Sequence, residues 1–161
     1  MNQEQESHMK SQTNHKYFMG EALIEAKIAF DKGEIPVGAV IVLNNEIIAR
    51  AHNLRESLND PTSHAEIEAI KLASQKLNSW RLNDCDLYVT LEPCPMCAGA
   101  LIQSRIRKVY FGAFDPKSGA ISSVIKLLDE PFNHKIEYEG GLLSSESSKL
   151  LKDFFSKIRK T

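Results

Sequence analysis

The sequence predicts a single α/β domain, over residues 15–161, in which helices pack on a mixed β-sheet. Short apolar runs of strand length alternate with segments of helical periodicity, and strands separated by helices indicate a layered α/β domain. Two adjacent apolar runs near the start form a hairpin, which makes the sheet mixed rather than purely parallel. With 161 residues, of which 42% are hydrophobic and 25% charged, the chain can bury a proper core.

Composition and charge narrow the class of protein. No apolar run approaches the roughly 20 residues of a membrane span, and residues 1–14 lack the apolar core of a secretory signal. We expect residues 1–14 to be a disordered or appended tail. Three cysteines without a signal argue against a disulfide framework and favour the reducing cytoplasm. A net charge of −1 gives no global indication of nucleic acid, so such a partner would need local patches.

The first elements are a helix and a hairpin. Apolar residues recur at helical spacing from Tyr17 to Phe30, and Gly33 is a plausible stop for that helix. Two apolar runs, 37–43 and 46–49, follow, joined by Asn44-Asn45. Because Asn tolerates the positive φ of tight turns, these runs predict a β-hairpin.

A second helix follows a polar loop. Thr62 or Ser63 can cap this helix, which ends near Leu77 and places His64 and Glu66 in its first turn. A spacing of two residues is about 200° on an ideal helix, so these two side chains do not share a face. The spacing alone therefore does not show that they meet.

The third helix carries two cysteines. An apolar strand over 86–90 leads into Cys94-Pro95-Met96-Cys97, and proline suits the first helical position, so Cys94 becomes the cap. The remaining segments complete the sheet and its covering layer. They are a strand at 108–112, a loop at 113–119, a helix to Leu128, a weak edge strand at 135–139 and an amphipathic helix at 144–160.

The two cysteines and the upstream histidine have the chemistry of a zinc site. Two cysteines three apart at a helix start can face one centre, and the positive end of the helix dipole lowers the pKa of a thiol. Zinc takes Cys and His ligands, and the set Cys94, Cys97 and His64 leaves a fourth position for water, whose pKa zinc lowers to about 7. His-x-Glu followed by Pro-Cys-x-x-Cys is the pattern of zinc deaminases. Glu66 is then the candidate to move protons from that water to the substrate.

Each half of this pattern alone fits other sites. Cys-x-x-Cys after a strand also fits a redox dithiol of thioredoxin type. A structural zinc site is a second alternative, which requires a fourth protein ligand such as Cys85, His52 or His134. The conjunction of the two halves, each opening a helix with an apolar strand between them, favours hydrolytic zinc chemistry.

Four segments resemble the bacterial tRNA-specific adenosine deaminases, which convert the wobble adenosine of a tRNA anticodon to inosine. They are DPTSHAEIEAI, LYVTLEPCPMCAGALIQSRI, VYFGAFDPKSGA and FNHKIEYEGGLL, and the resemblance runs from about Tyr17 to the C-terminus. It implies the cytidine-deaminase-like three-layer α/β/α sandwich with about five strands, a cytoplasmic homodimer, one zinc ion per subunit and tRNA as partner.

The resemblance also implies residue roles. His64, Cys94 and Cys97 match the zinc ligands, Glu66 the proton shuttle and Asn53 an asparagine that reads the base. Further RNA contacts fall on Asp115 and Asn133. Independently of the resemblance, Phe155 belongs to a basic C-terminal helix and is an aromatic residue able to stack on RNA. A turn residue is an equal alternative for Asn133, and core packing an open alternative for Phe155. Because the zinc motif is shared with free nucleobase and nucleoside deaminases, a guanine or cytosine deaminase is the alternative function.

Overall fold

The computed structural model is organised around one five-stranded sheet. The structure describes residues 2–159, and of residues 6–13 it describes the backbone only. The strands are β1 (Gly38–Leu43), β2 (Glu46–His52), β3 (Asp86–Leu91), β4 (Lys108–Ala113) and β5 (Glu137–Gly140). Their order is β2-β1-β3-β4-β5, with β1 antiparallel to both neighbours and β3, β4 and β5 parallel. The predicted mixed sheet is confirmed.

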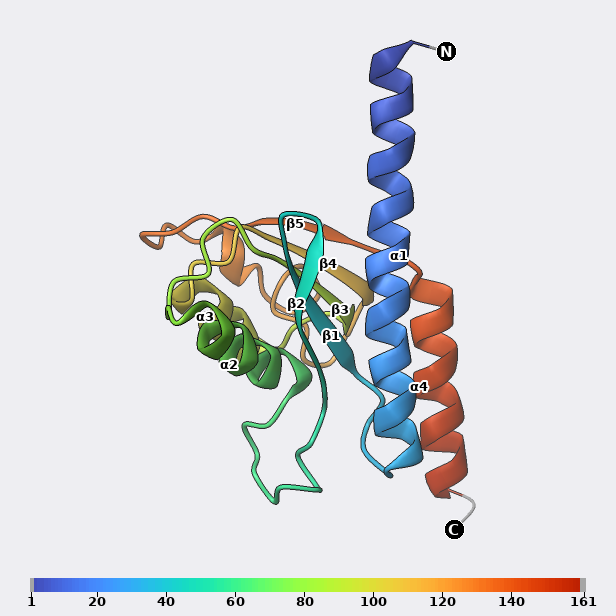
Figure 1. Cartoon of the computed structure of the whole chain (residues 1–161). Helices are drawn as coiled ribbons and strands as arrows, with labels where there is room; N and C mark the ends of the chain where they lie inside the picture. Colours follow the sequence, from blue (N-terminus) through green and yellow to red (C-terminus); the bar gives the residue numbers. More distant parts are fainter. Residues whose placement is uncertain (1, 160–161) are drawn as a thin grey trace.

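Helices cover both faces of this sheet (Figure 1). The helices are α1 (Gln3–Asp31), α2 (Ala65–Leu77), α3 (Pro95–Gln103) and α4 (Ser144–Arg159), with a 3₁₀ turn, η1, at Leu127–Asp129. α1 and α4 lie side by side on one face, and α2 and α3 cover the other, so the α/β/α sandwich is confirmed. Within the described residues, no helix combines the length and apolarity that crossing a bilayer requires.

The hairpin forms as predicted. Asn44 and Asn45 have φ angles of 50° and 65°, so both adopt the left-handed conformation that a two-residue hairpin turn with right-handed twist requires. β2 continues past the predicted end to His52, with a register shift opposite the bond between Ile41 and Val42. The extension carries the chain to Asn53, at the edge of the sheet where β3 ends.

α1 is longer than the helix expected over residues 17–30. It begins at Gln3, where the Asn2 side chain accepts the backbone N–H of Gln5 and the Gln5 side chain accepts that of Asn2. This capping box starts a helix within residues 1–14, for which we expected a disordered tail. The helix ends at Asp31, and Gly33 at φ 79° turns the chain toward β1.

α1 packs closely on β1 and covers the core on one face of the sheet. A Cβ atom on Gly38 would lie 2.0 Å from the backbone oxygen of Ala22, so only glycine allows this distance. Phe18, Met19 and Tyr88 are buried here, whereas the larger apolar cluster fills the opposite face beneath α2 and α3.

The helix predicted to end at Leu128 is wrong. Residues 114–126 form turns and bends without an α-helix, and the only helical piece between β4 and β5 is η1. The backbone N–H groups of Ile121, Ser122 and Ser123 donate to the carboxylate of Glu92 instead of to carbonyls one helical turn back. The last helix ends at Arg159, and Lys160, its predicted end, lies outside the described residues.

Candidate metal centre and pocket

Two helix starts meet at the edge of the sheet where β3 ends. Cys94 is the N-cap of α3 with Pro95 in the first turn, as predicted. The prediction that Thr62 or Ser63 caps α2 is wrong, because His64 itself is the N-cap, with extended backbone angles of φ −71° and ψ 155°. His64 therefore lies outside the helix that Glu66 belongs to, and the 200° separation expected on an ideal helix does not apply.

The three predicted zinc ligands converge. His64 Nδ1 lies 3.6 Å from Cys94 Sγ and 3.5 Å from Cys97 Sγ, and all three ligand atoms lie within 4.8 Å of one another. Zn–N and Zn–S bonds of ordinary length at a tetrahedral angle separate N and S by roughly 3.5 Å. The donor set and its spacing therefore fit a zinc ion.

The electrostatics of the cluster favour a thiolate. Hydrogen bonds from the Cys97 thiol and from His64 lower the pKa of Cys94 to about 4, against the opposing effect of burial. Contact with Cys94 and burial raise the pKa of Cys97, and contact with Cys94 raises the pKa of His64. The protein thus stabilises negative charge on one sulfur, the form in which a cysteine binds a metal.

Glu66 lies beside this cluster in the first turn of α2. Its side chain is 4% exposed, and it lines the same pocket as His64 and Cys94. Burial, helped by the negative charge on Cys94, raises the pKa of Glu66 to about 7. A carboxyl group with a pKa near neutrality can both accept and release a proton under physiological conditions.

His64, Cys94 and Glu66 line a cavity of about 210 Å³. Asn53 lies in its wall, where its side-chain oxygen accepts the backbone N–H of Arg55 and its amide nitrogen donates to the carbonyl of Ile35. An amide oxygen accepts two hydrogen bonds and an amide nitrogen donates two. One of each therefore remains for a ligand, while the backbone holds the side chain in place.

The remaining predicted contact residues lie in three different places. Asp115 lines the cavity, and its side chain accepts the backbone N–H groups of Lys117 and Ser118. Asn133 is exposed in the loop before β5, where His134 bonds the carbonyl of Ile106 at the sheet edge opposite the cavity. Phe155 is 41% exposed on α4 and contacts Phe154 edge-to-face.

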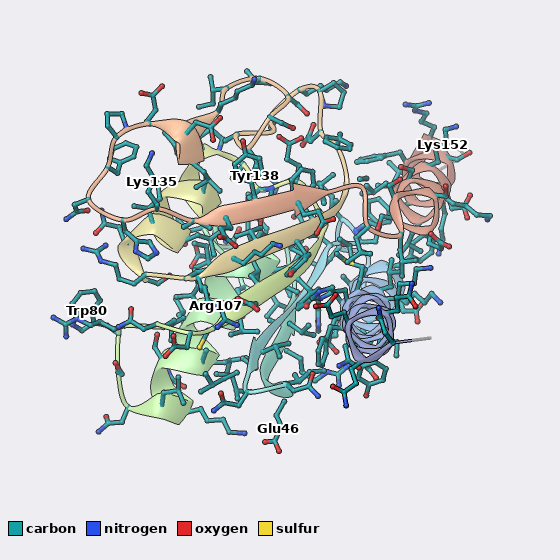
Figure 2. The ribbon with its side chains drawn as sticks, turned by 90° about the horizontal axis from the view of Figure 1, so that it is seen from above. Glu46, Trp80, Arg107, Lys135, Tyr138 and Lys152 are labelled. Carbon is teal, nitrogen blue, oxygen red and sulfur yellow. The ribbon has the colours of Figure 1, made fainter. Side chains whose placement is uncertain are left out.

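Neither Asn133 nor Phe155 is among the residues that line the cavity. Figure 2 shows Lys135, from the same loop as Asn133, and Lys152, from α4, on opposite sides of the molecule. Any RNA contact by these two residues would therefore lie outside the pocket of this chain. Phe154, 4% exposed, packs against Phe30 of α1 and belongs to the core.

Several residues that line the cavity were not predicted from the sequence. They are Ile35, Val37, Arg55, Leu91, Glu92 and Ser118. Only Glu92 carried a signal, an acidic residue at the end of an apolar strand directly before Pro93-Cys94. Arg55 and Ser118 lie in polar loops, where nothing in the sequence distinguishes them from solvated residues.

The alternative of a structural zinc site lacks its fourth ligand. Among the described residues, the only His, Cys, Asp or Glu group arranged to hold a metal is His64, Cys94 and Cys97. His52 bonds Glu25 and Lys32, His134 bonds a backbone carbonyl, and Cys85 is buried at the other end of β3. A redox dithiol would not require His64 to contact both sulfurs.

Comparison with known proteins agrees with this arrangement. The MafB19-like deaminase family matches residues 13–159. The chain is 52% identical to the tRNA-specific adenosine deaminase of Bacillus subtilis over 149 residues, 92% of either chain. It is 55% identical to the tRNA-specific adenosine deaminase of Aquifex aeolicus over 145 residues, 89% of this chain and 95% of that one.

Solved structures show the same similarity. A structure from a study of A-to-I editing by tRNA:A34 deaminases superposes with a TM-score of 0.82 at 47% identity, over 84% of this chain and 99% of that one. The guanine deaminase of Bacillus subtilis is more distant, with a TM-score of 0.61 at 33% identity over 91% and 94% of the chains.

Proposed function

Because this chain belongs to the MafB19-like deaminases and, among them, to the tRNA-specific adenosine deaminases, we propose that it converts the wobble adenosine of a tRNA anticodon to inosine. The observation that carries the proposal is the convergence of His64, Cys94 and Cys97 beside the buried carboxyl group of Glu66. One imidazole and two thiolates are a ligand set that leaves zinc an open position for catalysis.

The proposed chemistry is hydrolytic. Zinc, when bound by these three residues, supplies the Lewis acidity that makes a water molecule nucleophilic near neutral pH. Glu66 accepts a proton from the attacking water and delivers it to N1 of the adenine ring. Glu66 then takes the remaining proton of that water from the hydroxyl formed on C6 and passes it to the departing amine, so the C–N bond breaks and adenosine and water become inosine and ammonia.

The cavity wall suggests how the base is held. Asn53 has one N–H and one oxygen lone pair free, with which it can hydrogen-bond the edge of a purine. Because the backbone of Arg55 and Ile35 already fixes its side chain, binding the base costs little further side-chain entropy. A base must leave its stack to enter so enclosed a site, as deaminases of nucleic acids require. Asp115 at the rim is the proposed contact to the anticodon loop, and Asn133 and Phe155 are proposed outer contacts.

Assembly and location are further parts of the proposal. The family resemblance favours a homodimer, which light scattering on the purified protein would measure directly. A tRNA substrate and three free cysteines favour a reducing cytoplasm.

The decisive experiment is a competition between substrates. The zinc-loaded protein is given an anticodon stem-loop with adenosine at the wobble position, against free adenine, guanine and cytosine. We expect ammonia release and inosine only from the stem-loop. Release from guanine or cytosine instead would identify a nucleobase deaminase, and RNA binding without ammonia would identify a zinc-stabilised binding module.

A further inference from the structure

The carboxylate of Glu92 is the centre of a loop that no part of the proposed chemistry explains. Glu92 follows β3, two residues before Cys94, and is 2% exposed. Its Oε1 accepts the backbone N–H of Asp115 and the hydroxyl of Ser123. Its Oε2 accepts the backbone N–H groups of Ile121, Ser122 and Ser123, at 3.1, 2.8 and 3.0 Å.

All five of these donors belong to one segment, 115–123, which we call the rim loop. The loop is also tied to the backbone next to Glu92, because the Ala120 N–H donates to the carbonyl of Pro93. The Glu92 N–H donates to the carbonyl of Ala113, the last residue of β4, just before the loop begins. It closes tightly around the carboxylate, because a Cβ atom on Gly119 would lie 2.3–2.4 Å from the carboxyl atoms. Converging backbone N–H groups of this kind form an anion-binding nest, here filled by the protein's own side chain.

The rim loop supplies two residues to the cavity, Asp115 and Ser118. The Asp115 side chain accepts the backbone N–H groups of Lys117 and Ser118. The backbone N–H of Asp115 donates to the Glu92 carboxylate. Asp115 is therefore bonded to the Glu92 carboxylate directly, and Ser118 is linked to it through the Asp115 side chain. Because residues 115–125 contain no α-helix or strand, no regular backbone ladder would hold the loop without Glu92.

We propose that Glu92 is a positioning residue that fixes the rim loop in the shape that presents Asp115 and Ser118 to the RNA substrate. The inference rests on the proposed function for the identity of the substrate. Glu92 acts through the loop and does not touch the reacting atoms. An amide in its place keeps the size of the side chain but turns one acceptor into a donor that faces N–H groups. A loop held this way favours substrate binding by being ordered before the RNA arrives.

The test compares Glu92→Gln, Ser123→Ala and Gly119→Ala with wild type. Gly20→Ala is the matched control, since a Cβ at Gly20 meets nothing within 4 Å. Three quantities are measured on the zinc-loaded proteins: amide hydrogen exchange of residues 113–124, zinc per chain, and kcat and KM for the anticodon stem-loop. Exchange of residues 54–58, the loop that carries the cavity residue Arg55, serves as the internal reference.

We expect Glu92→Gln to speed exchange in the rim loop and to raise KM by about tenfold, the change expected for losing one charge-assisted hydrogen bond, with a smaller fall in kcat. Zinc content and exchange of residues 54–58 should stay at wild-type values. Ser123→Ala and Gly119→Ala should act in the same direction, Ser123→Thr should restore the hydroxyl contact and the KM, and Gly20→Ala should match wild type.

Loss of zinc with an unchanged KM would overturn the proposal, because Glu92 would then support Cys94 rather than the loop. Unchanged exchange in the rim loop would overturn it as well. A wild-type protein that does not deaminate the stem-loop would contradict the proposed function instead, and the exchange measurement would still report whether Glu92 orders the loop. If Glu92→Gln does not fold, the Ser123 and Gly119 variants give the same readouts.

Discussion

The Nδ1 atom of His64 lies 3.5 Å from the Sγ atom of Cys97, although the two residues are thirty-three positions apart in the chain. They meet because α2 and α3 both start at the edge of the sheet where β3 ends. His64 reaches the sulfurs because it is the N-cap of α2, where the backbone is still extended. Because the candidate metal ligands come from two helix starts, bound metal would report that both helix starts are in place.

Cys97→Ser should abolish stoichiometric zinc binding. The change leaves His64 and Cys94, and two ligands do not hold zinc as three do. We expect zinc, measured by elemental analysis of the dialysed protein, to fall from about one ion per chain to a small fraction of that. Cys85→Ala is the control, because that thiol is buried away from the cluster. Full zinc content in Cys97→Ser would remove Cys97 from the ligand set.

Glu66→Ala should retain zinc and lose turnover. Glu66 is not among the converging metal ligands, and its pKa of about 7 suits proton transfer. We expect kcat to fall by about 10²–10⁴, the usual contribution of a general acid–base. Ammonia release from the stem-loop and zinc content are measured on the same sample. A variant without metal would show instead that Glu66 supports the ligands.

Asn53→Ala should weaken the reaction without changing zinc content. The side chain offers one free donor and one free acceptor to the base, and its loss leaves the polar edge of the base unpaired. A penalty of roughly 1–3 kcal/mol corresponds to about a 5- to 150-fold drop in kcat/KM. Asn53→Asp separates the two contacts, since it keeps the acceptor and removes the donor. Wild-type kinetics for the alanine variant would exclude Asn53 from the base pocket.

What the sequence predicted were features determined by neighbouring residues. Proline at the first turn of α3 and two asparagines in the hairpin act within a few positions, and both elements formed as expected. The fold class followed from alternating strands and helices. The pairing of His64 with the cysteines came from the motif, since helical geometry alone argued against it.

The features that sequence reasoning missed depend on distant contacts. Residues 121–123 are not helical because Glu92, about thirty positions earlier, takes their N–H groups. Arg55 reaches the cavity only because Glu34 and Asn53 hold its loop. Local propensity contains none of this information.

Gly38→Ala should destabilise the fold, whereas Gly20→Ala should stabilise it. A Cβ at Gly38 would collide with the backbone of Ala22 and Ala26 at 2.0 and 2.5 Å, and backbone cannot move aside cheaply. We expect a loss of about 1–3 kcal/mol or more from this overpacking. A Cβ at Gly20, within α1, meets open space, so the gain in helix propensity of roughly 0.5–1 kcal/mol remains. Urea unfolding measures both changes: the free energy of unfolding should fall for Gly38→Ala and rise for Gly20→Ala.

Glu34 should make stability depend on pH in the acid range. Its carboxylate is fully buried and accepts the backbone N–H groups of Glu56 and Ser57, at 3.0 and 2.6 Å. Burial alone would raise the pKa of Glu34, but the hydrogen bonds from Ser57 and Glu56 outweigh it and leave the pKa below its usual value. A pKa lowered by folding contributes stability that is complete above the unfolded pKa of about 4.3 and is lost as the pH falls through the folded value.

Glu34→Gln removes this contribution and should cost about 1–3 kcal/mol at pH 7, because one acceptor of two buried N–H groups becomes a donor. The difference in unfolding free energy between wild type and variant should shrink as the pH falls below about 4.3. Urea unfolding of both proteins at matched pH values between about 7 and 3 measures that difference, and effects of acid on the metal ligands cancel in it. A difference that stays constant across this range would mean that the Glu34 carboxylate does not titrate with a lowered pKa and that the loop of residues 54–58 is held by other contacts.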